Sequence, residues 1–144
     1  MNQTHPMELV RDFMRTYQQF IPQSPVMPDP VTQNLRYRLI DEEAQELSAA
    51  TTRSEYLDAI GDLLYVVYGS ALAAGFSPHQ VDAAFTEIHR SNMSKCWSDD
   101  EIDCIPADCR STRVGDNRHI VRRSDGKIVK SPSYSPARLE GYTL

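Results

Sequence analysis

The segment from Ile60 to Phe76 constrains the fold more than any other part of this 144-residue chain. It is the most apolar run, yet it contains Asp62 and two tyrosines, and it is too short for a confident membrane span. Its middle, DLLYVVYGSAL, is apolar nearly all round, which is typical of a helix packed centrally in a bundle or against a second subunit. We therefore expect a helical bundle without a membrane partner.

Capping and breaking signals divide the first 95 residues into four predicted helices. The prolines of residues 22–30 indicate an extended connector after the first helix. Thr52 with Glu55, and Ser77 with Gln80, have the spacing of capping boxes that begin the third and fourth helices. The predicted helices span about residues 7–20, 31–50, 53–75 and 78–95.

The chain changes character after Trp97. Residues 98–117 are polar and aperiodic, so they are predicted to form a loop or short turns. Asp125-Gly126 is a turn signal that could join two short strands, and SPSYSPARL is predicted to be an extended tail with a final helical turn. The predicted fold class is all-α: a bundle of four to five helices over residues 1–95, with residues 96–144 as an irregular extension of the same domain.

Composition limits the partners and the compartment. The net charge of −5 and pI near 5.3 oppose binding to nucleic acid or to anionic membranes, but they allow a small anionic substrate held through a metal. The N-terminus shows no basic-then-apolar export signal. Cys96, Cys104 and Cys109 lack Cys-x-x-Cys spacing, so we predict free thiols in a reducing cytoplasm. A zinc site with His89 or His119 is the alternative, although its spacing matches no standard template.

The predicted second helix carries acids where apolar side chains are expected. In LRYRLIDEEAQEL, Glu42 and Glu46 fall within roughly 60° of Leu39 on a helical wheel, and Glu43 lies slightly further round. Buried, unpaired carboxylates are costly because desolvation disfavours their charged form. Either a cation offsets that cost, or this face is a solvated helix surface.

The third helix repeats the pattern with Asp58 and Asp62, which lie one turn apart. Five carboxylates facing one another would raise each other's pKa values, and divalent cations would relieve the conflict. An oxygen-only ligand set suits Mg²⁺ or Mn²⁺, which bridge carboxylates to phosphates. Two alternatives stay open: Asp62 could pair with Arg36 or Arg38, and Asp58 could stabilise its helix through the macrodipole.

Several separated segments resemble one superfamily. DEEAQEL, LDAIGDLLYVVYG, EIHRSNMSK and RRSDGKIVKSPSYSPARL together resemble the MazG-like all-α nucleoside triphosphate pyrophosphohydrolases, which include phosphoribosyl-ATP pyrophosphohydrolase and dimeric dUTPases. The chain looks most similar to small, phage-type members. The resemblance implies hydrolysis between the α- and β-phosphates to a nucleoside monophosphate and pyrophosphate, with Mg²⁺ or Mn²⁺. It also implies a homo-oligomer, commonly a tetramer built as a dimer of dimers.

The resemblance also implies roles for individual residues. Glu43, Glu46 and Asp62 match metal-ligand positions, with Glu42 a further candidate, and Glu43 is the expected general base. The family usually has a glutamate at the position of Ala59, so Asp58 is a candidate substitute ligand. Four residues are expected to contact phosphates, unless they are solvated groups at a helix end or tail: Asn92, Lys95, Arg90 and Lys130. Four aromatic residues could flank a base or simply pack in the core: Phe13, Tyr17, Phe20 and Tyr65.

The expected function follows, with its alternatives. We expect a metal-dependent pyrophosphohydrolase that favours purine deoxynucleotides, dGTP or dATP, in phage nucleotide-pool control. A first alternative is house-cleaning hydrolysis of dUTP or damaged nucleotides. A second, of another class, is a non-catalytic, metal-stabilised helical oligomer or nucleotide-binding module, which Ala59 favours.

Overall fold

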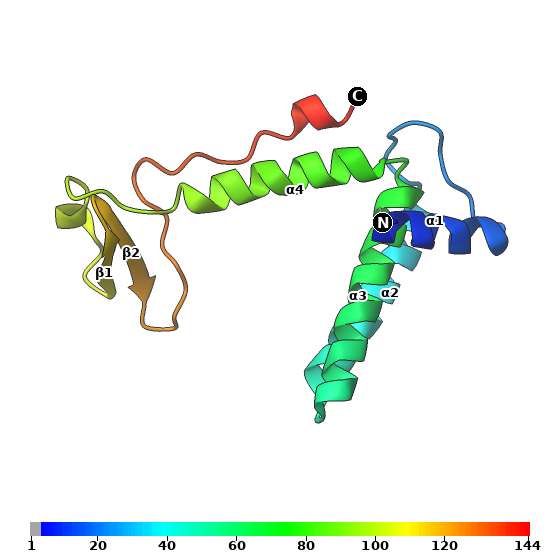
Figure 1. Cartoon of the computed structure of the whole chain (residues 1–144), viewed down its shortest axis with the longest axis horizontal. Helices are drawn as coiled ribbons and strands as arrows, with labels where there is room; N and C mark the ends of the chain where they lie inside the picture. The colour runs from blue at the N-terminus through cyan, green and yellow to red at the C-terminus, as the bar shows by residue number, and fades with distance from the viewer. Residues whose placement is uncertain (1–3) are drawn as a thin grey trace. The chain divides into compact units, whose positions relative to one another are not determined.

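A computed structural model describes residues 4–144 of the chain (Figure 1). It contains α1 (Pro6–Thr16), α2 (Pro30–Ala49), α3 (Arg53–Ala73), α4 (Pro78–Met93), β1 (Cys109–Gly115) and β2 (Arg118–Arg123), with 3₁₀ turns at Ile102–Cys104 and Glu140–Tyr142. The chain divides into two compact units: the first ends at Asp82 and takes in Thr143 and Leu144, and the second is Ala83–Tyr142. The predicted helical fold with a short β-hairpin is confirmed.

The helices begin where local side-chain hydrogen bonds satisfy their free amides. Asp29 caps α2 by accepting from two backbone amides of the first turn. The hydroxyl of Thr52 accepts from the Glu55 amide at 3.2 Å, and the Glu55 carboxylate accepts from the Thr52 amide at 3.1 Å. Ser77 and Gln80 make the same reciprocal bonds at 2.9 and 3.3 Å. Both predicted capping boxes are therefore confirmed.

The first helix ends earlier than predicted. The sequence pattern runs to Phe20, but α1 ends at Thr16 because Gln18 adopts a left-handed φ of 55°. The Gln19 amide then bonds to the Met14 carbonyl at 2.8 Å, which closes the turn. No glycine marks this stop, so the sequence carries no signal for it.

The proline-rich connector is fixed to the end of α3. The Val26 amide donates to the Ala74 carbonyl at 2.9 Å. Gly75 has a φ of 78°, and a Cβ at this position would lie 2.2 Å from the Ser24 carbonyl oxygen. Any other residue at position 75 would therefore displace the connector.

The core of the first unit joins α1 to the C-terminal end of α3. Its buried members are Met7, Val10 and Met14 on one helix and Leu72 and Ala73 on the other. Burying each large side chain contributes roughly 1.5–3 kcal/mol. α2 lies beside α3 (Figure 1), yet it buries no side chain completely. Much of the apolar surface of α2 and α3 is therefore exposed in a single chain.

The second unit has a small core of its own around Trp97, Cys109 and Val121. The Trp97 indole donates to the Val129 carbonyl at 3.0 Å, which brings the chain after β2 back over the hairpin. All three cysteines of the chain are free thiols, as predicted.

The hairpin lies earlier in the chain than predicted. β1 and β2 pair antiparallel and are joined at residues 116–117, where Asn117 has a φ of 53°. Residues 98–117 are therefore not only loop and turns, since they contain β1. Asp125-Gly126 does form a turn, but this turn leads from β2 to an isolated bridge between Arg122 and Ile128.

The C-terminal tail runs along α4 within the second unit. The Ser131 hydroxyl donates to the Ser94 carbonyl at 3.1 Å, and the Ser135 amide donates to the Ser94 hydroxyl at 2.9 Å. Further along, the Arg138 amide donates to the Glu87 carboxylate at 3.0 Å. The predicted final helical turn is confirmed at Glu140–Tyr142.

A membrane-spanning helix requires sufficient length and apolarity. Within residues 4–144 no single helix has the length and apolarity to cross a bilayer, and α3 and α4 meet that test only as a bent pair.

Candidate functional site

The acidic residues of the first unit are positioned by the antiparallel pairing of α2 and α3. Arg36 Nη1 lies 2.8 Å from where a Gly69 Cβ would be. Two turns further along α2, Glu43 lies close enough to Asp62 of α3 for the charge of Asp62 to raise its pKa. Arg36 and Glu43 are seven residues apart, as are Asp62 and Gly69, so each pair spans two turns. This register places the carboxylates of α2 and α3 opposite one another.

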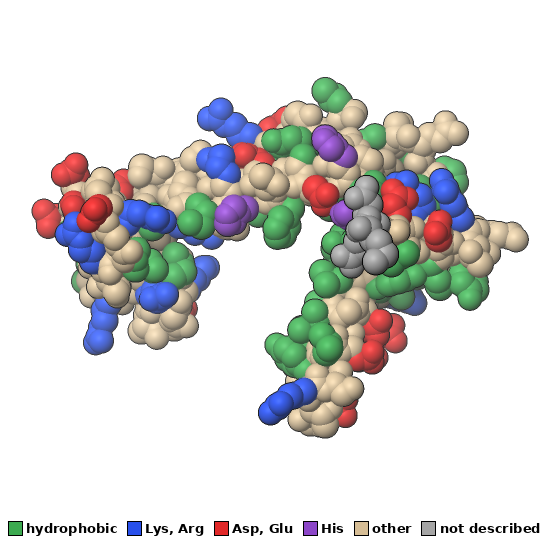
Figure 2. Space-filling view, in the orientation of Figure 1, with side chains coloured by type: hydrophobic (Ala, Val, Ile, Leu, Met, Phe, Trp, Pro, Cys, Tyr) green, Lys and Arg blue, Asp and Glu red, His purple; other side chains and the backbone are tan. Residues whose placement is uncertain are grey.

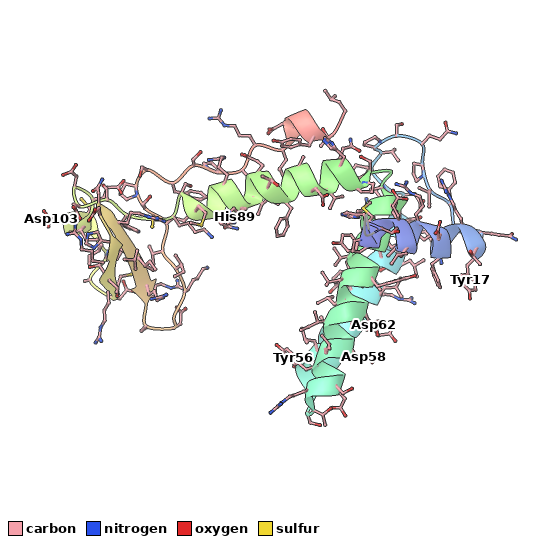
Figure 3. The ribbon with its side chains drawn as sticks, viewed as in Figure 1. Tyr17, Tyr56, Asp58, Asp62, His89 and Asp103 are labelled. Atoms are coloured by element: carbon pink, nitrogen blue, oxygen red, sulfur yellow. The ribbon has the colours of Figure 1, made fainter. Side chains whose placement is uncertain are left out.

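Glu43 is the centre of this acidic cluster. It is half-buried, whereas the other four carboxylates are exposed. Its Oε2 is shielded from solvent and has no hydrogen-bond partner. Burial raises the pKa of Glu43, and the charges of Glu46, Asp62, Glu42 and Asp58 raise it further. Figure 3 shows Asp58 and Asp62 along the same side of α3.

The acidic cluster does not provide a complete set of protein ligands for a metal ion. Across residues 4–144, no three His, Cys, Asp or Glu side chains converge tightly enough to hold an ion by themselves. Mg²⁺ commonly keeps several waters and binds through one or two carboxylates plus substrate phosphates. The unpartnered Oε2 of Glu43 and the oxygen-only donors around it fit a hard cation of this kind. Glu43, Glu46 and Asp62 are the residues that could hold it, with Glu42 and Asp58 beside them.

The alternative roles proposed for the aspartates find no support in the contacts. Asp62 is exposed, and Arg36 donates to the Gln19 side chain at 3.1 Å instead of to a carboxylate. The acidic residue in the first turn of α3 is Glu55 rather than Asp58. Neither aspartate is therefore explained by a helix-stabilising contact.

Ala59 is buried on the α3 face that meets α2. It is 3% exposed, and the helix register places it opposite Glu46. A glutamate here would bring another carboxylate into the cluster. Alanine instead leaves only a methyl group between the helices.

Three of the four candidate phosphate-binding residues gather around Tyr134 in the second unit. The Lys95 ammonium donates to Asn92 Oδ1 at 2.7 Å, and the Lys130 ammonium lies 4.3 Å from the centre of the Tyr134 ring. A hydrogen bond from Ser91 lowers the pKa of Tyr134, and the charges of Lys130 and Lys95 lower it further. Sequence reasoning missed Tyr134, although it lies in the SPSYSPARL segment.

Arg90 is occupied by contacts within the second unit. Its guanidinium donates to both Glu87 carboxylate oxygens at 2.8 Å, to the Ser135 hydroxyl at 3.1 Å and to the Pro136 carbonyl at 3.1 Å. These contacts attach the tail to α4. The Arg90 side chain is therefore less available to a substrate than Lys95 or Lys130.

Glu87→Gln is expected to loosen the C-terminal tail. The Arg90 hydrogen bonds, followed by the Arg138 amide, lower the pKa of Glu87 to about 2. The contribution of the ionised Glu87 carboxylate to stability is complete above its ordinary pKa of 4.5. It is lost as the pH falls from there through about 2. Hydrogen exchange at the Arg138 amide should accelerate in the variant at neutral pH, and in the wild type only in acid. Equal protection in both proteins at neutral pH would contradict this role.

Three of the four aromatic candidates for flanking a base, all of them partly exposed, contact one another. Phe13 lies with its ring centre 4.5 Å from that of Tyr17 and 5.7 Å from that of Tyr65. Phe20 is 82% exposed and lines an open hollow of about 460 Å³ with Leu35 and Arg36. Among the four, Phe20 is the residue best placed to meet a ligand.

The residues considered for zinc are not gathered into a metal site within the described part of the chain. His119 Nε2 lies 2.7 Å from an Asp99 carboxylate oxygen, and Cys96 Sγ lies 3.9 Å from an Arg118 nitrogen.

A sequence model of the phosphoribosyl-ATP pyrophosphohydrolase family matches residues 10–92, which is more than half of the chain. The chain belongs to this family. As a member of the MazG-like all-α superfamily, it is a pyrophosphohydrolase of the class that acts on nucleotides. The matched segment of this pyrophosphohydrolase contains all five clustered carboxylates and Asn92, and it ends before Lys95 and Lys130. No curated protein matches the chain.

Proposed function

We propose that the protein is a metal-dependent pyrophosphohydrolase that cleaves a nucleoside triphosphate between its α- and β-phosphates, with purine deoxynucleotides (dGTP or dATP) as preferred substrates. The observation that carries the proposal is Glu43, a half-buried carboxylate with an unpartnered oxygen among four other acids. Such a group needs a cation or a proton to complete its environment. The purine preference rests on the similarity to phage-type relatives.

Bound Mg²⁺ or Mn²⁺ would neutralise phosphate oxygens and lower the pKa of a water molecule. Glu43, Glu46 and Asp62 would hold the cation, with Glu42 and Asp58 as further candidate ligands beside them. Glu43 would accept the proton of the attacking water, since burial and the neighbouring carboxylates raise its pKa and so favour its protonated form. The water oxygen forms a bond to one of the two phosphorus atoms while the bond from that phosphorus to the bridging oxygen breaks, which releases nucleoside monophosphate and pyrophosphate.

The candidate phosphate-binding residues of the second unit offer positive charge and hydrogen-bond donors. Lys95 and Lys130 offer ammonium groups at Tyr134, and Asn92 offers an amide held by Lys95. Ammonium groups bind phosphate oxygens as point charges. Arg90 is a weaker candidate because its donors already bind the tail.

Product analysis tests this function directly. Purified protein is incubated with Mg²⁺ or Mn²⁺ and each common NTP and dNTP, and the products are separated by chromatography. Monophosphate plus pyrophosphate from dGTP or dATP is the expected result. The same products from dUTP alone would favour the house-cleaning alternative, and diphosphate plus phosphate would refute the cleavage position.

A binding module without turnover is the second candidate, and Ala59 is the observation that favours it. Alanine occupies a buried position where a further carboxylate ligand would be expected, so the cation site is poorer in ligands. No product from any nucleotide, together with a metal-dependent rise in the unfolding temperature, would support this candidate.

Self-association is part of the proposal. Apolar side chains of α2 and α3 are exposed in the single chain, including Leu35, Tyr37, Leu57, Leu64 and Val67. Large apolar patches at a protein surface typically mark protein–protein interfaces. A homo-oligomer, such as a dimer of dimers, would cover it.

Leu64→Asp is expected to shift the protein from oligomer to monomer in size-exclusion chromatography with light scattering. Leu64 is 52% exposed in the single chain, so the change should cost little within the monomer, but a charge in an apolar interface is expensive. Val114→Asp, at a hairpin residue 49% exposed, is the matched control and should leave the mass unchanged. A wild-type protein that is already monomeric would refute the oligomer.

A further inference from the structure

Two arginines lie directly opposite each other on the β1–β2 hairpin. The strand register pairs Arg110 with Arg122, and both side chains are exposed. We call these two residues the arginine pair. Like charges directly opposite in an antiparallel pair repel and destabilise the sheet. Among residues 4–144, no carboxylate forms an ion pair with either one.

Two other arginines of the strands do form ion pairs, whereas Arg118 has no carboxylate partner in the described part of the chain and donates to Cys96 Sγ at 3.9 Å. Arg113 forms an ion pair with Asp99 at 3.4 Å, and Arg123 forms one with Asp125 at 2.7 Å. Residues 109–130 contain seven Lys or Arg and two Asp, although the whole chain carries −5. Figure 2 shows Lys and Arg side chains around the hairpin. The hairpin is thus a local site of positive charge that its own carboxylates do not fully neutralise.

The arginine pair also lines a hollow of about 700 Å³. This volume lies within the range of roughly 300–1,000 Å³ that is usual for small-molecule sites. Thr112 and Ser124 contribute hydroxyl groups to the lining, and Arg123 contributes a third guanidinium. Asp108 is the acidic residue of the lining, and its carboxylate lies 3.6 Å from Cys109 Sγ. Donors and positive charge therefore dominate the hollow.

We infer that the arginine pair binds the phosphate groups of a small phosphorylated molecule. A planar guanidinium donates two parallel hydrogen bonds to phosphate oxygens, and an anion between the two arginines would relieve their repulsion. The volume of the hollow suits a small ligand, and the net charge of −5 on the whole chain would repel a long polyanion. This inference does not depend on the proposed hydrolysis, because the arginine pair has no role in it.

Calorimetry with inorganic triphosphate tests the inference on the full chain. EDTA is present, so the carboxylates of α2 and α3 bind no divalent cation that could attract the probe. Three proteins are compared: the wild type, the double variant Arg110→Gln with Arg122→Gln, and the matched control Arg113→Gln. Thermal unfolding of each protein shows whether it is folded.

We expect saturable binding by the wild type and a rise in Kd of at least about tenfold in the double variant, because two sets of charge-assisted hydrogen bonds are lost. Arg113→Gln should change Kd by less than about twofold, since its charge already pairs with Asp99. Equal weakening in the control, an unchanged Kd in the double variant (as binding at Lys95 and Lys130 would give), or no binding by the wild type, would overturn the inference. Tighter binding of a single-stranded oligonucleotide than of triphosphate, lost in the double variant, would overturn the assignment to a small ligand.

Discussion

Glu43→Gln is expected to lower kcat by about 10³-fold, in the range observed when a general base is removed. The same change should raise the unfolding temperature of the metal-free protein. Glu43 is half-buried, has an unpartnered oxygen and lies among four other acids, so its charge destabilises the fold when no cation is bound. A gain in stability with a loss of turnover is typical of a functional residue.

The pH dependence of stability gives a second measure of Glu43. Its folded pKa is raised, so the metal-free wild type loses stability as the pH rises from the ordinary value of 4.5 through the folded pKa. The glutamine variant should lack this loss. Asp41→Asn is the matched control, because it removes a charge from the same helix at an exposed residue that bonds only to Gln45. A Glu43→Gln enzyme with wild-type kcat would refute its role as the base.

Removal of divalent cations with EDTA is expected to reduce turnover by at least about 10³-fold, because the neighbouring charges that act on Glu43 are those of carboxylates. Adding Mn²⁺ or Mg²⁺ back should restore turnover and raise the unfolding temperature, since an ion that binds only the folded state stabilises it. Differential scanning fluorimetry across a metal titration measures the second effect without any substrate.

Two single-residue variants test whether the cation binds at the acidic cluster. Asp62→Asn should blunt the rise in unfolding temperature because it removes a carboxylate that faces Glu43 across the helix pair. Asp41→Asn should leave the rise intact. Full activity in EDTA would contradict the metal requirement, and an equal metal response in both variants would place the ion elsewhere.

The fold was predictable wherever local signals decide it. The reciprocal bonds of Thr52 with Glu55 begin α3 as predicted, because a capping box satisfies backbone amides within four residues of sequence. β1 was missed because it has a single buried residue and no alternation of apolar and polar side chains. Cys109 of this otherwise polar strand packs with Trp97 and Val121, and only the folded unit brings these together.

The site was predictable as a set of residues but not as a geometry. Helical spacing identified the acids of α2 and α3 because side chains one turn apart share a face. The special position of Glu43 depends on burial between the helices, which spacing alone does not resolve. Tyr134 was missed because it meets Lys95 and Lys130 through the tail along α4, a contact made by serine hydroxyls and backbone groups rather than by an apolar pattern.

The core that joins α1 to α3 bears on how the chain folds as it is synthesised. Met14 and its buried partner Leu72 are separated by 58 positions, so α1 leaves the ribosome long before its packing surface exists. An isolated helix of 11 residues is only marginally stable in water. The first unit should therefore remain unfolded until the end of α3 has emerged from the ribosome, and then fold in one step. A nascent chain arrested before that point would expose the methionine face of α1 to chaperones.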